Sequence, residues 1–337
     1  MTATIVDVAA RAGVSTATVS RVLSGSGSAL PATRDRVLAA AHELSYRPSG
    51  VARALKRAET KTIGLVVTDI ANPFFPQIVR GVEDEAHRRG YGVLLCNAAD
   101  DAARELATLD LLVERRVDGI VLASGRATRR LSRRLAALPM PVVLVNAEAG
   151  VRGLSSIGTA QRAGARLAAE HLIGLGHRRL AFVGAPRGHV AAGPRRSGVA
   201  DAVRDARMDA DALVVIPGDG RVSGGMRAAT ELLASRPLPT GIVAYNDLTA
   251  IGVMRALRAA GIDVPVAASV VGFDDIEPAS WTDPPLTTVR QPAAEMGRWA
   301  VERVASALQG AEDPMRKTLA PELVVRASTA PPPVAPG

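Results

Sequence analysis

Residues Thr4–Gly25, which read TIVDVAARAGVSTATVSRVLSG, decide how the N-terminal part of the chain folds. The apolar side chains at positions 5, 8, 9 and 12 recur at the spacing of one helix face. Gly13 then offers a permissive turn position, and Ser15 can cap a second helix. The second helix has an apolar stripe of its own, formed by Val19, Val22 and Leu23. The pattern predicts two short helices joined by a tight turn.

The outward face of the second helix is small and polar apart from one arginine, and it consists of Thr16, Ala17, Ser20 and Arg21. Small side chains allow a helix to enter the major groove of DNA, and Arg21 can donate a fork of hydrogen bonds to guanine or to phosphate. A hairpin of two helices in a small bundle can also have a polar outer face. Periodicity alone favours neither interpretation.

The residues that follow favour the interpretation as a DNA reader. A third helix, which begins near Pro31, supplies the missing core face through Val37, Ala40, Ala41 and Leu44. Residues 1–60 contain eight Lys and Arg against four Asp and Glu, and the basic residues crowd toward the end of this segment. Such a distribution suits a phosphate surface. Ser49 can cap a further helix of about two turns, which is too short to be stable alone in water.

Several blocks of the sequence resemble the LacI/GalR (lac repressor) family of bacterial transcription regulators. The matching strings are, in order, DVAARAGVSTATVSRVL, ELSYRPSGVARALKR, TIGLVVTDIANPFF, HLIGLGHRRLAFVG, YNDLTAIGVMRAL, SVVGFDDIEPA and PPLTTVRQP. The similarity runs from about Thr4 to about Arg326, which is nearly the whole chain.

The resemblance implies a helix-turn-helix headpiece over residues 1–48 and a hinge helix with linker over residues 49–60 that orders on DNA. Leu55 would insert into a minor-groove step at the centre of a palindromic operator, as an apolar side chain on a basic segment can do. Lys56 would contact phosphate. Docking of Leu55 on the next domain is the alternative. The regulator would bind its operator as a homodimer.

From Thr62 onward, apolar runs of strand length alternate with helical patterns. We expect one series of strands at 63–67, 92–95, 119–122 and 142–145, and a second at 180–183, 213–216, 241–244 and 269–273. Two successive βαβα series predict two doubly wound parallel sheets, each covered by helices.

The resemblance implies a periplasmic-binding-protein-like, effector-binding core over residues 61–326, in which the chain crosses three times between two lobes. Lobe 1 would hold residues 61–160 and 291–326, and lobe 2 residues 161–290. The proline-rich residues 327–337 are expected to form a disordered tail. Since this tail has four prolines and no leucine, we expect a dimer and no tetramer.

Polar residues follow several predicted strands, where ligands bind in doubly wound sheets. They include Asp69, Ser124, Asn146, Asn246, Asp247, Asp274 and Asp275. Each alone suits a helix cap or a turn, but together they predict one cleft. The resemblance adds Arg195 as an effector-holding guanidinium, Asn246 and Asp274 as contacts, and Phe74 and Phe75 as an apolar wall.

A carboxylate, an amide and a guanidinium that converge in a cleft suit a polyhydroxylated ligand such as a sugar. We expect Arg195 and Asp274 to meet only around a bound ligand or water. Two residues depart from the family pattern, because Gly220 stands where an aromatic ring often closes the pocket and Ala147 replaces a polar residue.

Enzyme motifs are absent from the sequence: it has no Walker A loop, no G-x-S-x-G, no CxxC and no metal-ligand spacing among its five histidines. No cofactor and no metal are therefore expected. The single Cys96 fits a reducing compartment, and no leader or membrane segment is visible, so we expect a cytoplasmic protein. The favoured function is a repressor of a carbohydrate-related operon that a sugar-like effector releases. A corepressor-dependent regulator, a sugar-binding protein without a regulatory role and a sugar enzyme are the alternatives.

Overall fold

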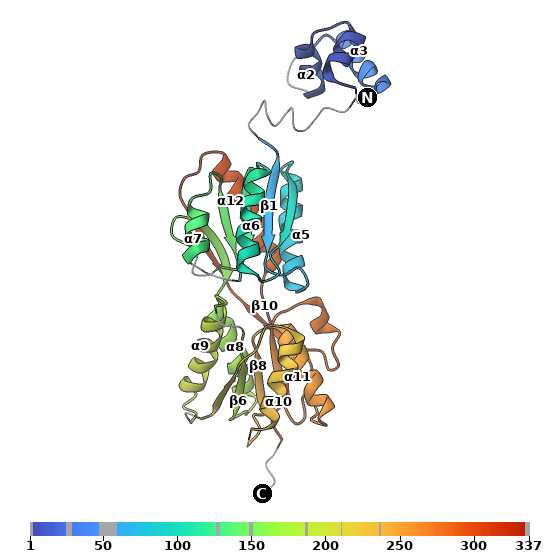
Figure 1. Cartoon of the computed structure of the whole chain (residues 1–337). Coiled ribbons are helices and arrows are strands. Elements are labelled where there is room, and N and C mark those ends of the chain that lie inside the picture. The colour runs from blue at the N-terminus through green and yellow to red at the C-terminus, as the bar shows by residue number, and fades with distance from the viewer. Residues whose placement is uncertain are drawn as a thin grey trace. The chain divides into compact units, whose positions relative to one another are not determined.

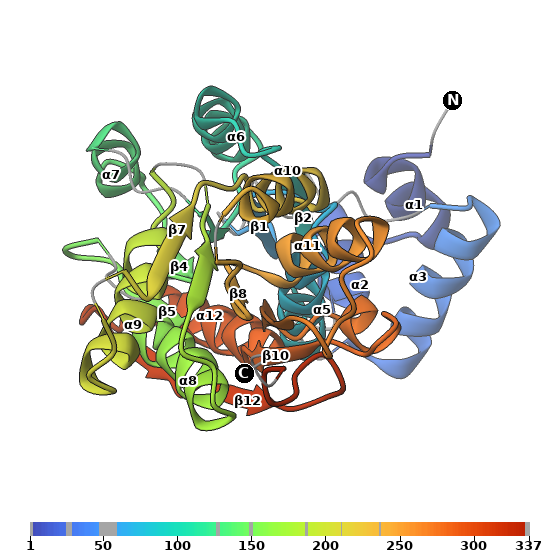
Figure 2. The ribbon, with the colours of Figure 1, turned by 90° about the horizontal axis from the view of Figure 1, so that it is seen from below.

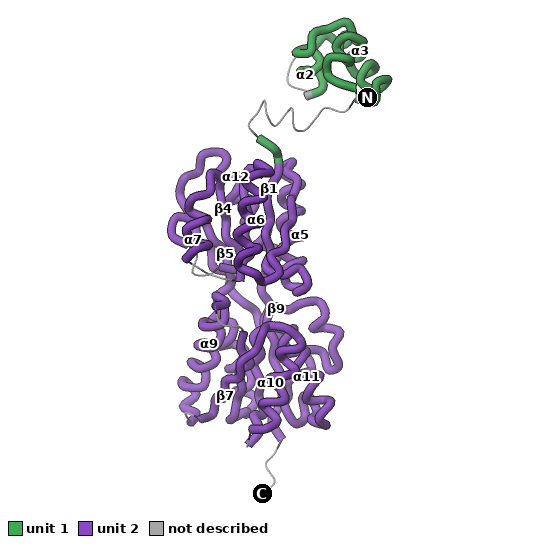
Figure 3. Tube along the Cα trace, in the orientation of Figure 1, with its two compact units in different colours: residues 1–61 green, residues 62–337 purple. Residues whose placement is uncertain are grey.

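The computed structural model describes residues 3–24, 29–46, 59–125, 129–147, 151–185, 188–209, 211–235 and 237–333. The chain divides into two compact units between Lys61 and Thr62 (Figure 3). Unit 1 is helical, whereas unit 2 contains two six-stranded sheets and their covering helices. No helix within the described ranges is long and apolar enough to cross a membrane.

Unit 1 consists of α1 (Ile5–Ala12), α2 (Thr16–Ser24) and α3 (Pro31–Glu43). Thr4 begins α1 with a capping box, in which its backbone N–H donates to the Asp7 carboxylate at 2.8 Å. Gly13 ends α1 in the left-handed conformation, with φ of 64°, as the predicted turn requires. The core is formed by apolar side chains from all three helices, including the fully buried Val8, Val19 and Val37. The expected hinge helix, with Leu55 and Lys56, lies outside the described residues.

Lobe 1 of unit 2, which contains β1 in Figure 1, is built on a parallel sheet. The strand order of this sheet is β11-β5-β4-β3-β1-β2. Its strands are β1 (Thr62–Val67), β2 (Gly92–Asn97), β3 (Gly119–Ala123), β4 (Val142–Val145), β5 (Ser155–Thr159) and β11 (Arg316–Leu319). Helices α5 (Phe74–Arg88) and α12 (Ala293–Leu308) pack on one face. Helices α6 (Ala102–Glu114) and α7 (Arg129–Ala136) cover the other.

Lobe 2 is built on a sheet with the order β12-β10-β9-β8-β6-β7. Its strands are β6 (Leu180–Val183), β7 (Leu213–Ile216), β8 (Gly241–Ala244), β9 (Ser269–Asp274), β10 (Thr287–Arg290) and β12 (Glu322–Val324). Figure 2 shows α8 (Gln161–Gly174) and α9 (Ala192–Asp205) on one side of these strands, and α10 (Val222–Leu233) and α11 (Asp247–Ala259) on the other. A short 3-10 helix, η1 (Glu277–Ser280), follows β9. The two doubly wound sheets of the predicted fold class are therefore present.

Glycines allow the covering helices to pack closely in pairs. A Cβ atom on Gly81 of α5 would lie 2.1 Å from the backbone oxygen of Ala294 in α12. In the same way, a Cβ atom on Gly198 of α9 would lie 2.1 Å from the backbone oxygen of Arg162 in α8. Backbone atoms cannot move aside as a flexible side chain can, so both contacts require glycine.

The chain passes between the lobes around residues 160, 291 and 320, three times in all (Figure 1). The assignment of residues 291–326 to lobe 1 is therefore wrong at its end. After β11 the chain returns to lobe 2, where β12 pairs with β10 in antiparallel orientation. Without β12, the backbone groups at the β10 edge of the lobe 2 sheet would be unpaired, and β12 covers this edge.

Residues 327–333 pack on lobe 2, so the expectation that the tail is disordered from residue 327 is also wrong. Ser328 is fully buried, and its hydroxyl donates to the Val270 carbonyl at 2.6 Å. The Val270 N–H in turn donates to the Ser328 carbonyl at 2.9 Å. Proline prevents helix and sheet formation, but it does not prevent neighbouring residues from hydrogen-bonding to existing strands.

Candidate functional site

The surface predicted to read DNA lies on α2. Val19 and Val22 of this helix are buried in the core of unit 1. The opposite face carries the four predicted side chains, of which three are exposed and one is half-buried: Thr16, Ala17, Arg21 and Ser20. Arg21 Nε donates to the Ala17 carbonyl at 3.4 Å. The helix therefore presents small side chains and one guanidinium to its surroundings, as a major-groove reader requires.

A cleft of about 390 Å³ lies between the two lobes, beyond the carboxyl ends of β1, β4, β8 and β9. Seven of the eight predicted effector residues line it: Asp69, Phe74, Phe75, Asn146, Arg195, Asn246 and Asp274. The eighth, Ser124, lines a neighbouring cavity, and the next residue, Gly125, faces the cleft. The cleft thus has an aromatic wall from lobe 1 and polar groups from both lobes.

Arg195 and Asp274 are in direct contact, with 3.6 Å between Nη2 and Oδ1, and are only 2% and 4% exposed. We expected them to meet only around a ligand or water, and that expectation is wrong. The Arg195 guanidinium lies over two aromatic rings: its Cζ atom is 3.6 Å from the centroid of the Phe273 ring and 4.7 Å from that of Tyr245. This aromatic packing holds the guanidinium beside the carboxylate.

Two glutamines connect this ion pair to the segments that cross between the lobes. Gln161 accepts a hydrogen bond from Arg195 Nε at 2.8 Å and donates to Gln291 at 3.0 Å. Gln291 in turn donates to Asp274 at 2.7 Å. Gln161 follows β5 at the first crossing and Gln291 follows β10 at the second. The interlobe crossings are therefore hydrogen-bonded to both polar anchors of the cleft.

The sequence patterns predicted no role for either glutamine. Gln291 comes directly after a strand and Gln161 two residues after one, where a polar residue is normally interpreted as a turn former. If the positions at which the chain passes between the lobes had been known, both glutamines could have been predicted to hydrogen-bond there, because a buried polar side chain needs a partner.

Asn246 has a structural role beside its place in the cleft. Its Oδ1 caps α11 by accepting from Thr249 N at 2.9 Å, and its Nδ2 donates to the Gly220 carbonyl at 2.9 Å. Gly220 has a φ of 74°, and a Cβ atom there would lie 3.7 Å from the ring of Tyr245. The ring of Tyr245, which precedes Asn246 in the sequence, therefore lies beside Gly220 in the cleft.

Burial governs the electrostatics of the cleft floor. It raises the pKa of Asp274, although the neighbouring Arg195 acts in the opposite direction. Burial also raises the pKa of Asp247, which accepts from Ile276 N at 2.8 Å. A carboxyl group that can hold a proton beside a fixed guanidinium offers both donors and acceptors, which hydroxyl groups of a ligand need.

The lobes also touch at the edges of the cleft. Asp69 of lobe 1 forms an ion pair with Arg221 of lobe 2 at 3.4 Å. The Val190 N–H donates to the Gly125 carbonyl at 2.9 Å. No group of three or more potential metal ligands occurs among the residues that the structure describes.

A helix-turn-helix unit joined to a two-lobed core with a polar interlobe cleft defines a class of ligand-binding, DNA-reading proteins. Residues 4–49 match the family model described as bacterial regulatory proteins, lacI family, and residues 169–329 match a periplasmic binding protein-like domain. The chain belongs to the lacI family of bacterial regulatory proteins. It is a DNA-binding transcription regulator and not an enzyme.

Similar proteins cover nearly the whole chain. The HTH-type transcriptional repressor PurR of Haemophilus influenzae (strain PittEE) is 34% identical over 97% of this chain and 98% of its own. The structure of the transcriptional regulator CelR in complex with cellobiose is 34% identical, with a TM-score of 0.75 over 97% of this chain and 99% of its own. The lac repressor dimer bound to operator and the anti-inducer ONPF is 29% identical, with a TM-score of 0.89 over 98% of this chain and 100% of its own.

Proposed function

We propose that this regulator is a cytoplasmic, homodimeric repressor of a carbohydrate-related operon, which a sugar or sugar derivative releases from a near-palindromic operator. In this proposal α2 enters the major groove with Thr16, Ala17, Ser20 and Arg21. Leu55 wedges into the minor groove at the centre of the operator, and Lys56 contacts phosphate.

The observation that carries the proposal is the convergence of Arg195, Asn246 and Asp274 in the interlobe cleft, beside the aromatic side chains of Phe74 and Phe75. Sugars present many hydroxyl groups on an apolar ring, so they need fixed donors, fixed acceptors and an apolar wall. The CelR structure contains cellobiose, which supports a carbohydrate as ligand of a core of this kind.

The hydrogen bonds of Gln161 and Gln291 suggest how a ligand acts. A ligand that contacts both lobes favours one lobe arrangement by as much as its affinities for the two arrangements differ. The crossing segments are bonded to Arg195 and Asp274, so a change at these anchors alters the lobe geometry. In a dimer, lobe movement would separate the two hinge helices and release the operator.

In-vitro selection of bound DNA, followed by operator binding in the presence of sugars, tests the proposal. We expect selection of a near-palindrome and loss of affinity when one sugar of the panel is added. Failure to select any common sequence would contradict the role as a regulator of one operon. A ligand that tightens operator binding would reverse the direction and favour corepression.

A further inference from the structure

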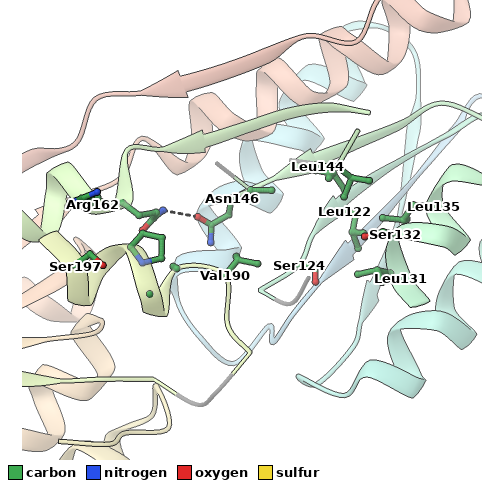
Figure 4. Close-up of a pocket in the computed structure, with 16 residues that line it drawn as sticks. Leu122, Ser124, Leu131, Ser132, Leu135, Leu144, Asn146, Arg162, Val190 and Ser197 are labelled. Carbon is green, nitrogen blue, oxygen red and sulfur yellow. Dashed lines mark hydrogen bonds between the residues drawn. The ribbon is translucent and has the colours of Figure 1, made fainter. Parts of the chain in front are cut away.

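A second cavity, of about 630 Å³, lies beside the cleft on the α7 side of lobe 1 (Figure 4). Its lobe 1 side is largely apolar and includes four leucines: Leu122 of β3, Leu144 of β4, and Leu131 and Leu135 of α7. Each of these side chains is buried. Protein interiors rarely leave voids larger than one water molecule. A cavity of this size is within the range of about 300–1,000 Å³ that small-molecule sites occupy.

Both lobes contribute polar groups to this leucine-lined cavity. Gln161, Arg162 and Ser197 come from lobe 2, and Ser124, Ser132 and Asn146 come from lobe 1. Arg162 forms an ion pair with Asp201 at 2.5 Å, so its charge is already balanced. The other described residues that line the cavity are uncharged, so the cavity suits an uncharged group.

The leucine-lined cavity and the cleft share Asn146 and are otherwise divided by a thin wall. On the wall, Ser124 and Val190 face the cavity, whereas their neighbours Gly125 and His189 face the cleft. The hydrogen bond from Val190 N to the Gly125 carbonyl closes it. One side of the wall comes from each lobe, so the passage past Asn146 depends on how the lobes are placed.

We propose that the leucine-lined cavity is an apolar subsite of the effector site. It binds an uncharged aromatic or short alkyl group whose polar partner, in the same molecule, lies in the cleft against Arg195 and Asp274. The effector is then a glycoside with an apolar substituent, which narrows the class of ligand. This inference rests on the proposed function for the polar half of the ligand.

The environment-sensitive dye N-phenyl-1-naphthylamine, which is neutral and apolar, tests the cavity in the full-length protein. We expect saturable fluorescence enhancement with one site per chain. Ser132→Phe, which fills the cavity from α7, should weaken binding at least about tenfold, and Ala147→Leu, which fills it from the loop after β4, should do the same. Ser132→Ala is the matched control and should bind as the wild type does. No saturable binding, or wild-type affinity for the dye in both filled variants, would overturn the proposal.

Competition between paired glycosides tests the link to the effector site. Phenyl β-D-glucopyranoside and phenyl β-D-cellobioside should displace the dye at concentrations at least about tenfold below those of their methyl counterparts. Ser132→Phe should remove this advantage. If neither phenyl glycoside surpasses its methyl counterpart, the cavity is no part of the effector site and the proposal fails. Operator affinity of the ligand-free protein, measured in parallel, reports on the proposed function independently.

Discussion

The Arg195 guanidinium lies 3.6 Å from the Asp274 carboxylate, and both side chains are almost completely buried in the cleft floor. The pair is therefore part of the folded core as well as of the ligand site. Any substitution here changes stability and binding together, so the two effects have to be measured separately.

We expect Arg195→Ala to destabilise the protein by about 3–5 kcal/mol, because it leaves a buried carboxylate without its charged partner. Asp274→Asn should cost less, since the asparagine oxygen can still accept the hydrogen bond that Gln291 donates. Urea denaturation measures both changes.

Asp283→Asn is the control for this experiment. Its partner Arg258 lies 3.2 Å away, and both side chains are exposed, at 81% and 70%. An exposed pair contributes less than about 1 kcal/mol. Equal destabilisation by Arg195→Ala and Asp283→Asn would show that the buried pair does not stabilise the fold.

The guanidinium of Arg21 provides the test of DNA reading. We expect Arg21→Ala to weaken operator binding by about 1–3 kcal/mol and to relax sequence preference, because a lost base contact affects specific DNA more than random DNA. Fluorescence anisotropy with both DNAs measures this. Arg316→Ala removes the same charge at an exposed position of β11 and should change the affinity for neither the operator nor random DNA. Equal weakening on both DNAs would identify Arg21 as a phosphate contact only.

Gly81 allows α5 and α12 to pack closely. Gly81→Ala should destabilise unit 2 by about 1–3 kcal/mol, because its Cβ atom would overlap the Ala294 carbonyl. Gly174→Ala, in α8, has no atom within 4 Å of the added Cβ, so it should be neutral or stabilising by up to about 1 kcal/mol. A similar free energy of unfolding in both variants would contradict the packing argument.

Two histidines make the docking of residues 327–333 sensitive to pH. His177 Nε2 lies 3.0 Å from the Ala330 carbonyl, and His171 Nε2 lies 2.9 Å from the Thr329 hydroxyl. Burial lowers the pKa of both side chains from 6.5, so the unfolded chain binds protons more tightly than the folded one. Their contribution to stability is present above pH 6.5 and is lost as the pH falls.

We therefore expect the urea midpoint to fall between about pH 7 and pH 5, and less steeply in His177→Gln. His87→Gln, at an exposed position of α5, should leave the slope as it is in the wild type. An unchanged slope in His177→Gln would show that this ring does not couple protonation to folding.

The C-terminal residues bear on the oligomeric state. We expect a dimer in sedimentation, and truncation after Pro333 should leave it a dimer. Truncation from Ala327 would remove the buried Ser328 and should destabilise lobe 2 as well, so it is unsuitable as a test of assembly. A tetramer that becomes a dimer when residues 334–337 are removed would contradict this account.

Local sequence patterns predict the central elements of this fold because each buries a continuous apolar face. The strands β1, β3, β4, β6 and β8 are buried along their lengths, and their apolar runs show it. Some elements that we did not predict are short and polar, such as β11, which reads RKTL, and α7, which reads RRLSRRLA. An edge strand gains its stability from its neighbour, and that neighbour cannot be recognised from the strand's own residues.

The residues of the candidate site differ in how far local sequence determines their position. Asp69, Asn146 and Asp274 follow strands directly, so their place in the cleft follows from topology. Ser124 also follows a strand, but the next residue faces the cleft, and a shift of one position reverses the direction of a side chain. The roles of Gln161 and Gln291 depend on contacts across 130 residues of chain, which no local pattern contains.

The central claim is that a ligand bound in the interlobe cleft, against Arg195 and Asp274, controls affinity for the operator. The most direct measurement is operator binding by the wild type and by Asp274→Asn, each with and without the sugar that the panel identifies. We predict that both proteins bind the operator equally without ligand, and that the sugar weakens binding at least about tenfold only in the wild type. An equal response of the two proteins to the sugar would contradict the account.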